Sequence, residues 1–247
     1  MTARAGILYA FVFAVAAHGA TTTGGTISAR VAPTEAEVGL GFHGVTVRVE
    51  GEAPKGRDIL LTVLGEREKM TFSSKRKAWA FWIAGEKVAF ENAPALYIIK
   101  SSAPVGDVLP ESKAREMALG KEGLIASLAS SPSPVQLLGA REMVRLQRKL
   151  GLYETDGGGI MVNSDGSWAV DVNLPCRAPI GSYEITAVAV RGREVVSTAS
   201  AQFVLKPSRS VALLAGFARS HGFVYGAVAV LLAIMSGLAA GGLFEKK

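Results

Sequence analysis

The sequence predicts a mainly β protein, in which an Ig-like β-sandwich domain carries an inserted helical hairpin and is followed by one C-terminal transmembrane helix. Three observations predict this fold class. Several segments alternate apolar and polar residues with the period of two that strands require, residues 111–151 have helical spacing instead, and Gly222–Phe244 contains no charged residue.

The first nineteen residues have the pattern of a secretory signal peptide. Arg4 supplies a positive charge, Ala5–Ala17 is apolar, and Ala17-His18-Gly19 places small residues at the positions typical of a cleavage site. We expect residues 1–19 to be removed after Gly19 and the rest to be exported. An uncleaved N-terminal anchor is the alternative.

Residues 20–206 form the predicted exported domain, and seven of its segments have strand character. Asp58–Leu64 is apolar throughout, as expected of an inner strand, and Gly192-Arg193 predicts the turn of a hairpin that Pro207 closes. Short strands with this spacing favour a β-sandwich. The seven segments are Gly44–Glu50, Asp58–Leu64, Ala78–Ala84, Ala95–Lys100, Ser167–Leu174, Ser182–Arg191 and Glu194–Lys206.

Residues 111–151 interrupt this pattern with two predicted helices. The first has helical apolar spacing from Ala114 to Leu128, with Lys121 as one defect, and the second begins at Pro134 and is stopped by Gly151. We expect Val135, Met143, Leu146 and Leu150 to form the apolar face of the second helix. About 40 residues cannot hold an independent core, so the hairpin is predicted as an insertion and not as a domain.

The C-terminal run Gly222–Phe244 is long enough to cross a membrane as a helix, because its residues rise about 1.5 Å each and the hydrocarbon core is about 30 Å thick. Residues 207–221 form a predicted juxtamembrane segment, and residues 245–247 a cytoplasmic tail. An exported domain before a stop-transfer helix gives a single-pass protein whose bulk lies outside the cytoplasm. A buried core helix is the alternative for this run.

Residue types that support catalysis are sparse. Of three histidines only His43 lies inside the predicted domain, and it has no second ligand at metal-binding spacing. Cys176 is the only cysteine, so no internal disulfide is expected; we predict it to be buried or half-buried, with an intermolecular disulfide or redox role as the alternative. Gly157-Gly158-Gly159 lacks the lysine and hydroxyl residue of a phosphate loop and is interpreted as a flexible turn. We therefore predict no enzyme activity, no catalytic residue, no metal site and no cofactor.

Three surfaces are candidates for binding. A basic and aromatic run could hold an anion, and a stripe of arginines on the second predicted helix could face anionic lipid or an acidic partner, although each could also be an ordinary solvated face. Small residues along one face of the C-terminal helix could allow close packing of a second helix, although such residues are common in membrane helices. The three sets are Lys75, Arg76, Lys77, Trp79 and Trp82; Arg141, Arg145 and Arg148; and Gly222, Gly226, Ala229, Ala233, Gly237 and Gly241.

Several short runs, in this order and spacing, resemble the alphaproteobacterial family of transmembrane proteins of unknown activity that have a signal, a β-rich exported domain and one C-terminal helix. Cys176 stands at a position that is small in the family, and Ala80-Phe81-Trp82 replaces Gly-Ile-Trp. The runs that carry the resemblance are Gly41-Phe42-His43-Gly44, residues 76–83, residues 93–97, Arg145-Leu146-Gln147, Gly151-Leu152-Tyr153, residues 174–183 and Tyr225-Gly226.

The resemblance implies an inner-membrane protein with its bulk in the periplasm and, from the permease-like genes said to lie near such members, a transport setting. The leading functional hypothesis is a membrane-anchored accessory or assembly protein, which partners a membrane transporter or envelope complex through its C-terminal helix or self-associates. The alternative is a periplasmic binding module for a small anion or an anionic envelope polymer. The net charge of +6 is modest, and no nucleic-acid partner is expected.

Overall fold

A computed structural model describes residues 26–39, 41–78, 81–129 and 133–244 of the chain. Within these ranges the side chains of residues 73–78, 81–86, 210, 212, 214, 215 and 239–244 are not described. The predicted signal peptide, residues 1–19, and the predicted tail, residues 245–247, lie outside the described residues.

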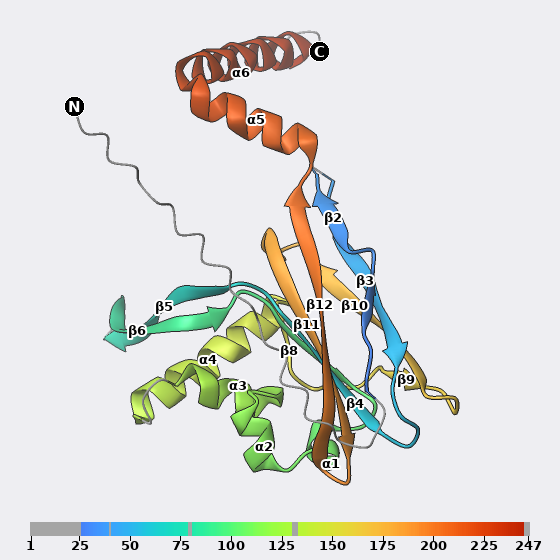
Figure 1. Ribbon diagram of the computed structural model, residues 1–247. Coiled ribbons are helices and arrows are strands. Elements are labelled where there is room, and N and C mark those ends of the chain that lie inside the picture. Colours follow the sequence, from blue (N-terminus) through green and yellow to red (C-terminus); the bar gives the residue numbers. More distant parts are fainter. Residues whose placement is uncertain (1–25, 40, 79–80, 130–132, 245–247) are drawn as a thin grey trace, which may run out of the picture.

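The protein is mainly β, as predicted, and its strands form two larger sheets and one hairpin (Figure 1). The first sheet has the order β1-β3-β10-β9, with antiparallel pairing throughout. Its strands are β1 (Arg30–Ala32), β3 (Gly44–Glu52), β9 (Met161–Val162) and β10 (Ser167–Pro175).

The second sheet has the order β2-β12-β11-β4-β7-β8. Its central pairs are antiparallel, whereas the two edge strands β2 and β8 each pair in parallel with their neighbour. The strands are β2 (Glu35–Val38), β4 (Asp58–Leu64), β7 (Tyr97–Ser101), β8 (Tyr153–Glu154), β11 (Gly181–Arg191) and β12 (Glu194–Pro207).

One hydrophobic core is built from both sheets. On β10 the alternation places Trp168, Val170, Val172 and Leu174 inside, each at most 3% exposed, where they share a cluster with inward residues of the second sheet. The hairpin β11–β12 turns at Gly192-Arg193 as predicted, since both residues have positive φ (56° and 69°), which matches the twist of the paired strands.

The second sheet is buried on both faces at β4, which explains the unbroken apolar run of this strand. Ile59, Leu61 and Val63 face the core between the sheets, whereas Leu60 faces a second cluster that the helices cover. That cluster also contains Tyr97 and other residues of β7 and β11, together with residues of the helices.

The third sheet is a long hairpin of β5 (Arg67–Ala78) and β6 (Phe81–Pro94), which the sequence did not predict. The strand predicted over Ala78–Ala84 is confirmed only in part, because Ala78 ends β5 and Phe81–Ala84 begin β6, which pairs antiparallel with β5. Register shifts between Glu68 and Met70 and between Ser73 and Lys75 interrupt the period-two pattern that would have identified these strands.

Four helices lie between β7 and β8: α1 (Val105–Val108), α2 (Glu111–Glu116), α3 (Gly120–Leu128) and α4 (Pro134–Lys149). The first predicted helix is divided into α2 and α3, because Ala118 and Gly120 have positive φ values of 53° and 69°. The Tyr97 hydroxyl donates to Ala118 O at 2.9 Å and accepts from Gly120 N at 2.9 Å, so β7 stabilises the break.

Helix α4 begins as predicted, with Pro134 in its first turn and the Ser133 hydroxyl accepting from Gln136 N at 3.2 Å. Its predicted apolar face is partly wrong, since Val135 and Leu146 are 46% and 44% exposed. The buried residues are Ala140, Met143, Val144 and Gln147. Gly139 lies close to β6, since an added Cβ there would lie 3.2 Å from a methyl of Val88 and 3.4 Å from the Phe90 ring.

The predicted juxtamembrane segment forms a helix, α5 (Arg209–Ser220), and is followed by α6, which has the predicted bounds Gly222–Phe244. Both helices project beyond the end of β12 (Figure 1). Among the described residues, no helix meets the length and apolarity required to cross a membrane.

Candidate functional site

A basic groove of about 610 Å³ lies between α3 and α4, and it contains the predicted arginine stripe. Five cationic side chains and two carboxylates line it, and Val144, which is 1% exposed, lies beneath them. The lining residues are Lys121, Glu122, Arg141, Glu142, Val144, Arg145, Arg148 and Lys149.

The walls of the basic groove are fixed by the helix–sheet core. Leu124 and Ile125 of α3 and Met143 and Val144 of α4 are each at most 3% exposed and belong to one cluster with residues of β4 and β7. The charged residues therefore lie on the outer faces of two helices whose inner faces pack in the core. The groove is part of the folded structure and does not depend on surface side chains alone.

Two of the arginines in the basic groove have acidic neighbours. Arg148 Nη2 lies 2.5 Å from Asp156 Oδ2, and Arg145 Nη1 lies 3.5 Å from Glu142 Oε2. Lys121, Arg141 and Lys149 form no ion pair with any residue that the structure describes. Since Arg145 and Glu142 are both more than 60% exposed, their pairing is worth at most about 1 kcal/mol and leaves Arg145 available to an anionic ligand.

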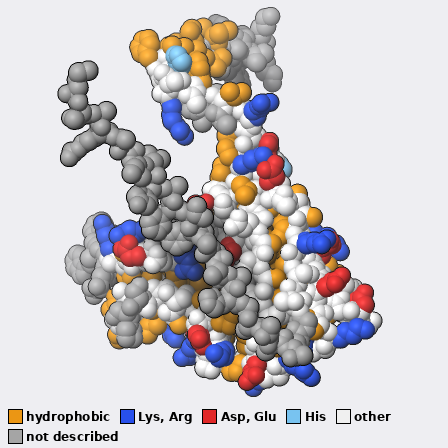
Figure 2. All heavy atoms as spheres, viewed as in Figure 1, with side chains coloured by type: hydrophobic (Ala, Val, Ile, Leu, Met, Phe, Trp, Pro, Cys, Tyr) orange, Lys and Arg blue, Asp and Glu red, His pale blue; other side chains and the backbone are white. Residues whose placement is uncertain are grey.

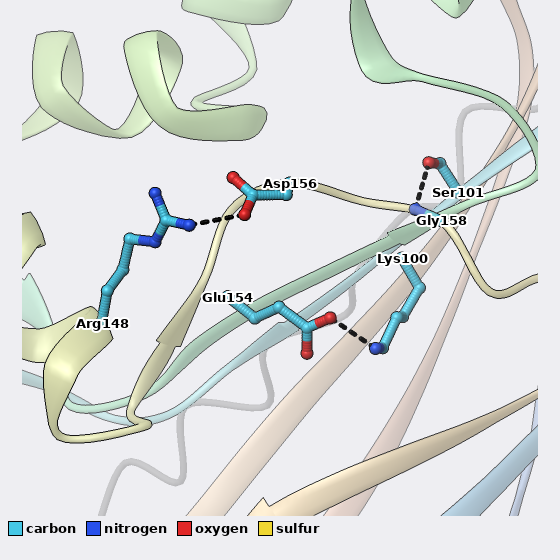
Figure 3. Close-up of polar contacts among 6 residues, drawn as sticks. All are labelled: Lys100, Ser101, Arg148, Glu154, Asp156 and Gly158. Atoms are coloured by element: carbon cyan, nitrogen blue, oxygen red, sulfur yellow. Dashed lines mark hydrogen bonds and ion pairs between the residues drawn. The ribbon is translucent and has the colours of Figure 1, made fainter.

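The segment after α4 holds Asp156 in place for this contact (Figure 3). Lys100 of β7 and Glu154 of β8 point toward one another, with Nζ and Oε1 2.5 Å apart, and the hydroxyl of the buried Ser101 accepts from Gly158 N at 2.7 Å. All three glycines of the predicted flexible turn have positive φ. The Lys100–Glu154 ion pair therefore fixes the chain before Asp156, and Ser101 with the left-handed backbone fixes it after Asp156.

A second hollow, of about 720 Å³, adjoins the basic groove and shares Lys121 and Glu122 with it. Its charges balance, with three cationic and three acidic side chains, and its wall includes the buried Leu109 and Leu119. Asp156 lines this second hollow while Arg148 lines the first, so one ion pair connects the two.

The basic and aromatic run is placed by the backbone on the β5–β6 hairpin. Arg76 pairs with Ile83 and Lys77 pairs with Trp82 across its end. Trp79 lies outside the described residues, and the side chains of Lys75, Arg76, Lys77 and Trp82 are not described. Anion binding at this run stays a prediction.

The small residues of α6 meet no other part of the chain where they are described. A Cβ added at Gly222, Gly226 or Gly237 would have no atom within 4 Å, and Ala229 and Ala233 are exposed. Gly241 belongs to the end of α6, where the side chains are not described. Figure 2 shows hydrophobic side chains gathered over this end of the molecule.

The two remaining candidates lie at the surface. His43 is exposed, and Cys176 is an exposed free thiol, so the prediction that Cys176 is buried or half-buried is wrong. It follows Pro175 at the end of β10, two residues after Leu174, the last buried position of that strand. No group of metal-binding side chains occurs among the described residues.

The sequence did not identify Lys121 and Lys149 as parts of the candidate site. Lys121 looked like a defect in an apolar pattern, and only the break at Ala118 turns α3 so that this residue faces α4. Lys149 could have been found, since it lies four residues after Arg145 and completes the same helical stripe.

The fold is that of a mainly β, multi-sheet protein with a helical layer and a helical C-terminal extension. A model of the family described as "Putative transmembrane protein (Alph_Pro_TM)" matches residues 26–246, and the chain belongs to this family, which confirms the resemblance inferred from the sequence. No curated protein and no solved structure matches the chain.

Proposed function

We propose that the protein is a membrane-anchored accessory or assembly protein, whose exported Ig-like domain is held beside an integral membrane partner by α6. The observation that carries this proposal is the exposure of apolar side chains on every side of α6. Val230, Leu231 and Leu232 are each 60% exposed and, as consecutive residues of a helix, point in directions about 100° apart. A helix that is apolar all round is stable only when lipid or protein covers it.

A membrane setting is favoured over burial in a soluble partner by three features. The chain belongs to a family described as transmembrane, α6 has no charged residue in Gly222–Phe244, and Leu213 and Phe217 expose further apolar surface on α5. In this proposal the signal peptide directs export, the β domain lies in the periplasm, and the chain ends in the cytoplasm.

A partner inside the membrane is favoured by the small residues of α6. Lipid does not drive helices together by the hydrophobic effect, so close backbone contact through small residues is a main source of association. The spacing from Gly222 to Gly237 keeps these residues on one face, and the space beside Gly226 and Gly237 is open. The occupant is a transporter helix, a helix of another envelope protein, or a second copy of α6.

Mild solubilisation of native membranes and native electrophoresis test this function. Gly226→Leu with Gly237→Leu fills the small-residue face, whereas Val228→Leu with Met235→Leu places two leucines on the opposite face with little change in bulk and serves as the control. We expect the wild type and the control to migrate in a complex and the glycine variant to migrate alone, while all three stay in the membrane fraction.

Two results would contradict the proposal. Recovery of the wild type in the soluble fraction after osmotic shock would contradict anchoring by α6. Migration of the wild type as a monomer, or an unchanged complex in the glycine variant, would contradict a partner at the small-residue face but not the anchoring.

A further inference from the structure

The basic groove between α3 and α4 and the second hollow beside it form a continuous concave surface whose two parts differ in chemistry. One part carries an excess of cations, and the other has balanced charges around apolar side chains. We propose that this surface binds an extended polypeptide segment that carries acidic side chains in one half and apolar side chains in the other.

The spacing of the arginines fits an extended chain. Arg141 and Arg145 are four residues apart on one helix, so their backbones are separated by about 6 Å along the axis. Side chains on the same side of an extended strand repeat about every 6.6 Å. Alternate carboxylates of a strand lying along α4 would therefore meet Arg141 and Arg145 in turn.

Cationic side chains of the basic groove that have no ion-pair partner among the described residues favour an anionic ligand. Lys121, Arg141 and Lys149 form no ion pair within the described residues, and the partner of Arg145 is a weak, exposed one. A carboxylate entering the basic groove gains these partners without breaking a buried ion pair.

Two features favour a polypeptide over a uniformly charged polymer such as a polyphosphate or an acidic glycan. Glu122 and Glu142 line the basic groove and would repel a ligand that carries negative charge at every repeat. The half-buried Val105 and Pro110 in the second hollow offer apolar contact, which such a polymer cannot use and a leucine or valine side chain can.

A lipid surface is disfavoured by position. Helices α2 and α3 lie toward the end of the molecule that is farther from α6, so α3 places its wall of the groove at a distance from the proposed membrane helix (Figure 1). This step rests on the proposed anchoring of α6, whereas the shape and charge of the surface do not.

Fluorescence anisotropy of the full chain in neutral detergent micelles tests the proposal. The probe is a fluorescein-labelled peptide with alternating glutamate and serine in its first half and alternating leucine and serine in its second half. We expect saturable binding that weakens as salt increases. The variant with Arg141→Glu and Lys149→Glu should bind the peptide with an affinity lower by about tenfold or more. The control, Arg30→Glu with Arg177→Glu, makes the same change in net charge at exposed sites elsewhere and should bind normally.

Competition experiments complete the test. Unlabelled peptide should displace the probe, whereas polyphosphate and vesicles of phosphatidylglycerol should not displace it at matched negative charge. Displacement by either would overturn the polypeptide assignment, and equal binding by the groove variant and the wild type would overturn the site. Membrane retention and migration in the α6 complex should be unchanged in the groove variant, so failure here is distinguishable from failure of the proposed anchoring.

Discussion

At the scale of single residues, Tyr97 connects the sheet to the helices that form the candidate site. Its ring is 1% exposed, and its hydroxyl bonds to both sides of the break between α2 and α3. The break cannot be predicted from local sequence, because alanine does not favour the left-handed backbone that Ala118 adopts. A hydrogen-bonding partner 21 residues away determines it.

Tyr97→Phe should therefore destabilise the protein although it removes one atom. The Ala118 carbonyl and the Gly120 N–H would lose their partner in a buried environment, which costs about 1–3 kcal/mol in the free energy of unfolding. Urea unfolding followed by the fluorescence of the buried Trp168 measures this change. Tyr225→Phe on the exposed surface of α6 is the control and should have no effect; equal stability of both variants would show that the hydroxyl does not hold the break.

At the scale of secondary structure elements, the sequence predicted strands well where each strand has one solvent-exposed face and one buried face. The pattern of β10 is clear because Trp168 and Val172 face a core while Asp171 and Asn173 face solvent. Prediction failed for the β5–β6 hairpin, whose bulges interrupt the alternation, and for the buried face of α4, which uses Ala140 and Gln147. The buried Gln147 donates from Nε2 to Met70 Sδ at 3.3 Å, a contact between distant segments that local sequence does not reveal.

The packing of α2 against α3 gives an element-scale prediction. A Cβ at Gly123 would lie 2.4 Å from Ala114 O and 3.0 Å from Ala118 C, so Gly123→Ala must push the two helices apart. We expect a loss of about 1–3 kcal/mol in the free energy of unfolding from overpacking, which exceeds the gain of about 1 kcal/mol in helix propensity.

Gly106→Ala in α1 is the matched control, since an added Cβ there meets nothing within 4 Å. It should leave the urea midpoint unchanged or raise it slightly. If Gly123→Ala raised the urea midpoint as much as Gly106→Ala does, α2 and α3 would not be closely packed at Gly123.

At the scale of the whole molecule, two cores share one sheet, and this arrangement explains what the sequence could and could not reveal about the candidate site. The sequence indicated Arg141, Arg145 and Arg148 because they repeat along one helix. It did not indicate Asp156, Lys121 or the second hollow, because these come from segments that meet only when α3 and α4 pack on the second sheet. The periodicity of a sequence predicts which residues share one face of a helix or strand. A groove depends on which of these faces pack against one another in the fold.

Both cores contain buried tyrosines, so alkaline pH should unfold the protein as a unit. Burial, with a smaller contribution from the charge of Glu66, raises the pKa of Tyr183 in the core between the sheets to about 12. Burial also raises the pKa values of Tyr97 and Tyr153 in the helix–sheet core well above the ordinary value near 10. Above pH 10 the unfolded chain loses these protons and the folded chain keeps them, so stability is complete below pH 10 and falls as pH rises toward 12 and beyond.

With three tyrosines, the free energy of unfolding should fall by about 4 kcal/mol per pH unit once the unfolded tyrosines are ionised. Urea unfolding at a series of pH values measures this slope, and tyrosinate absorbance reports ionisation. Tyr183→Phe should reduce the slope by about a third, whereas Tyr225→Phe should leave it unchanged. If Tyr97, Tyr153 and Tyr183 formed tyrosinate near pH 10 without any loss of the folded state, these three tyrosines would be accessible to solvent and the packing of both cores described above would be wrong.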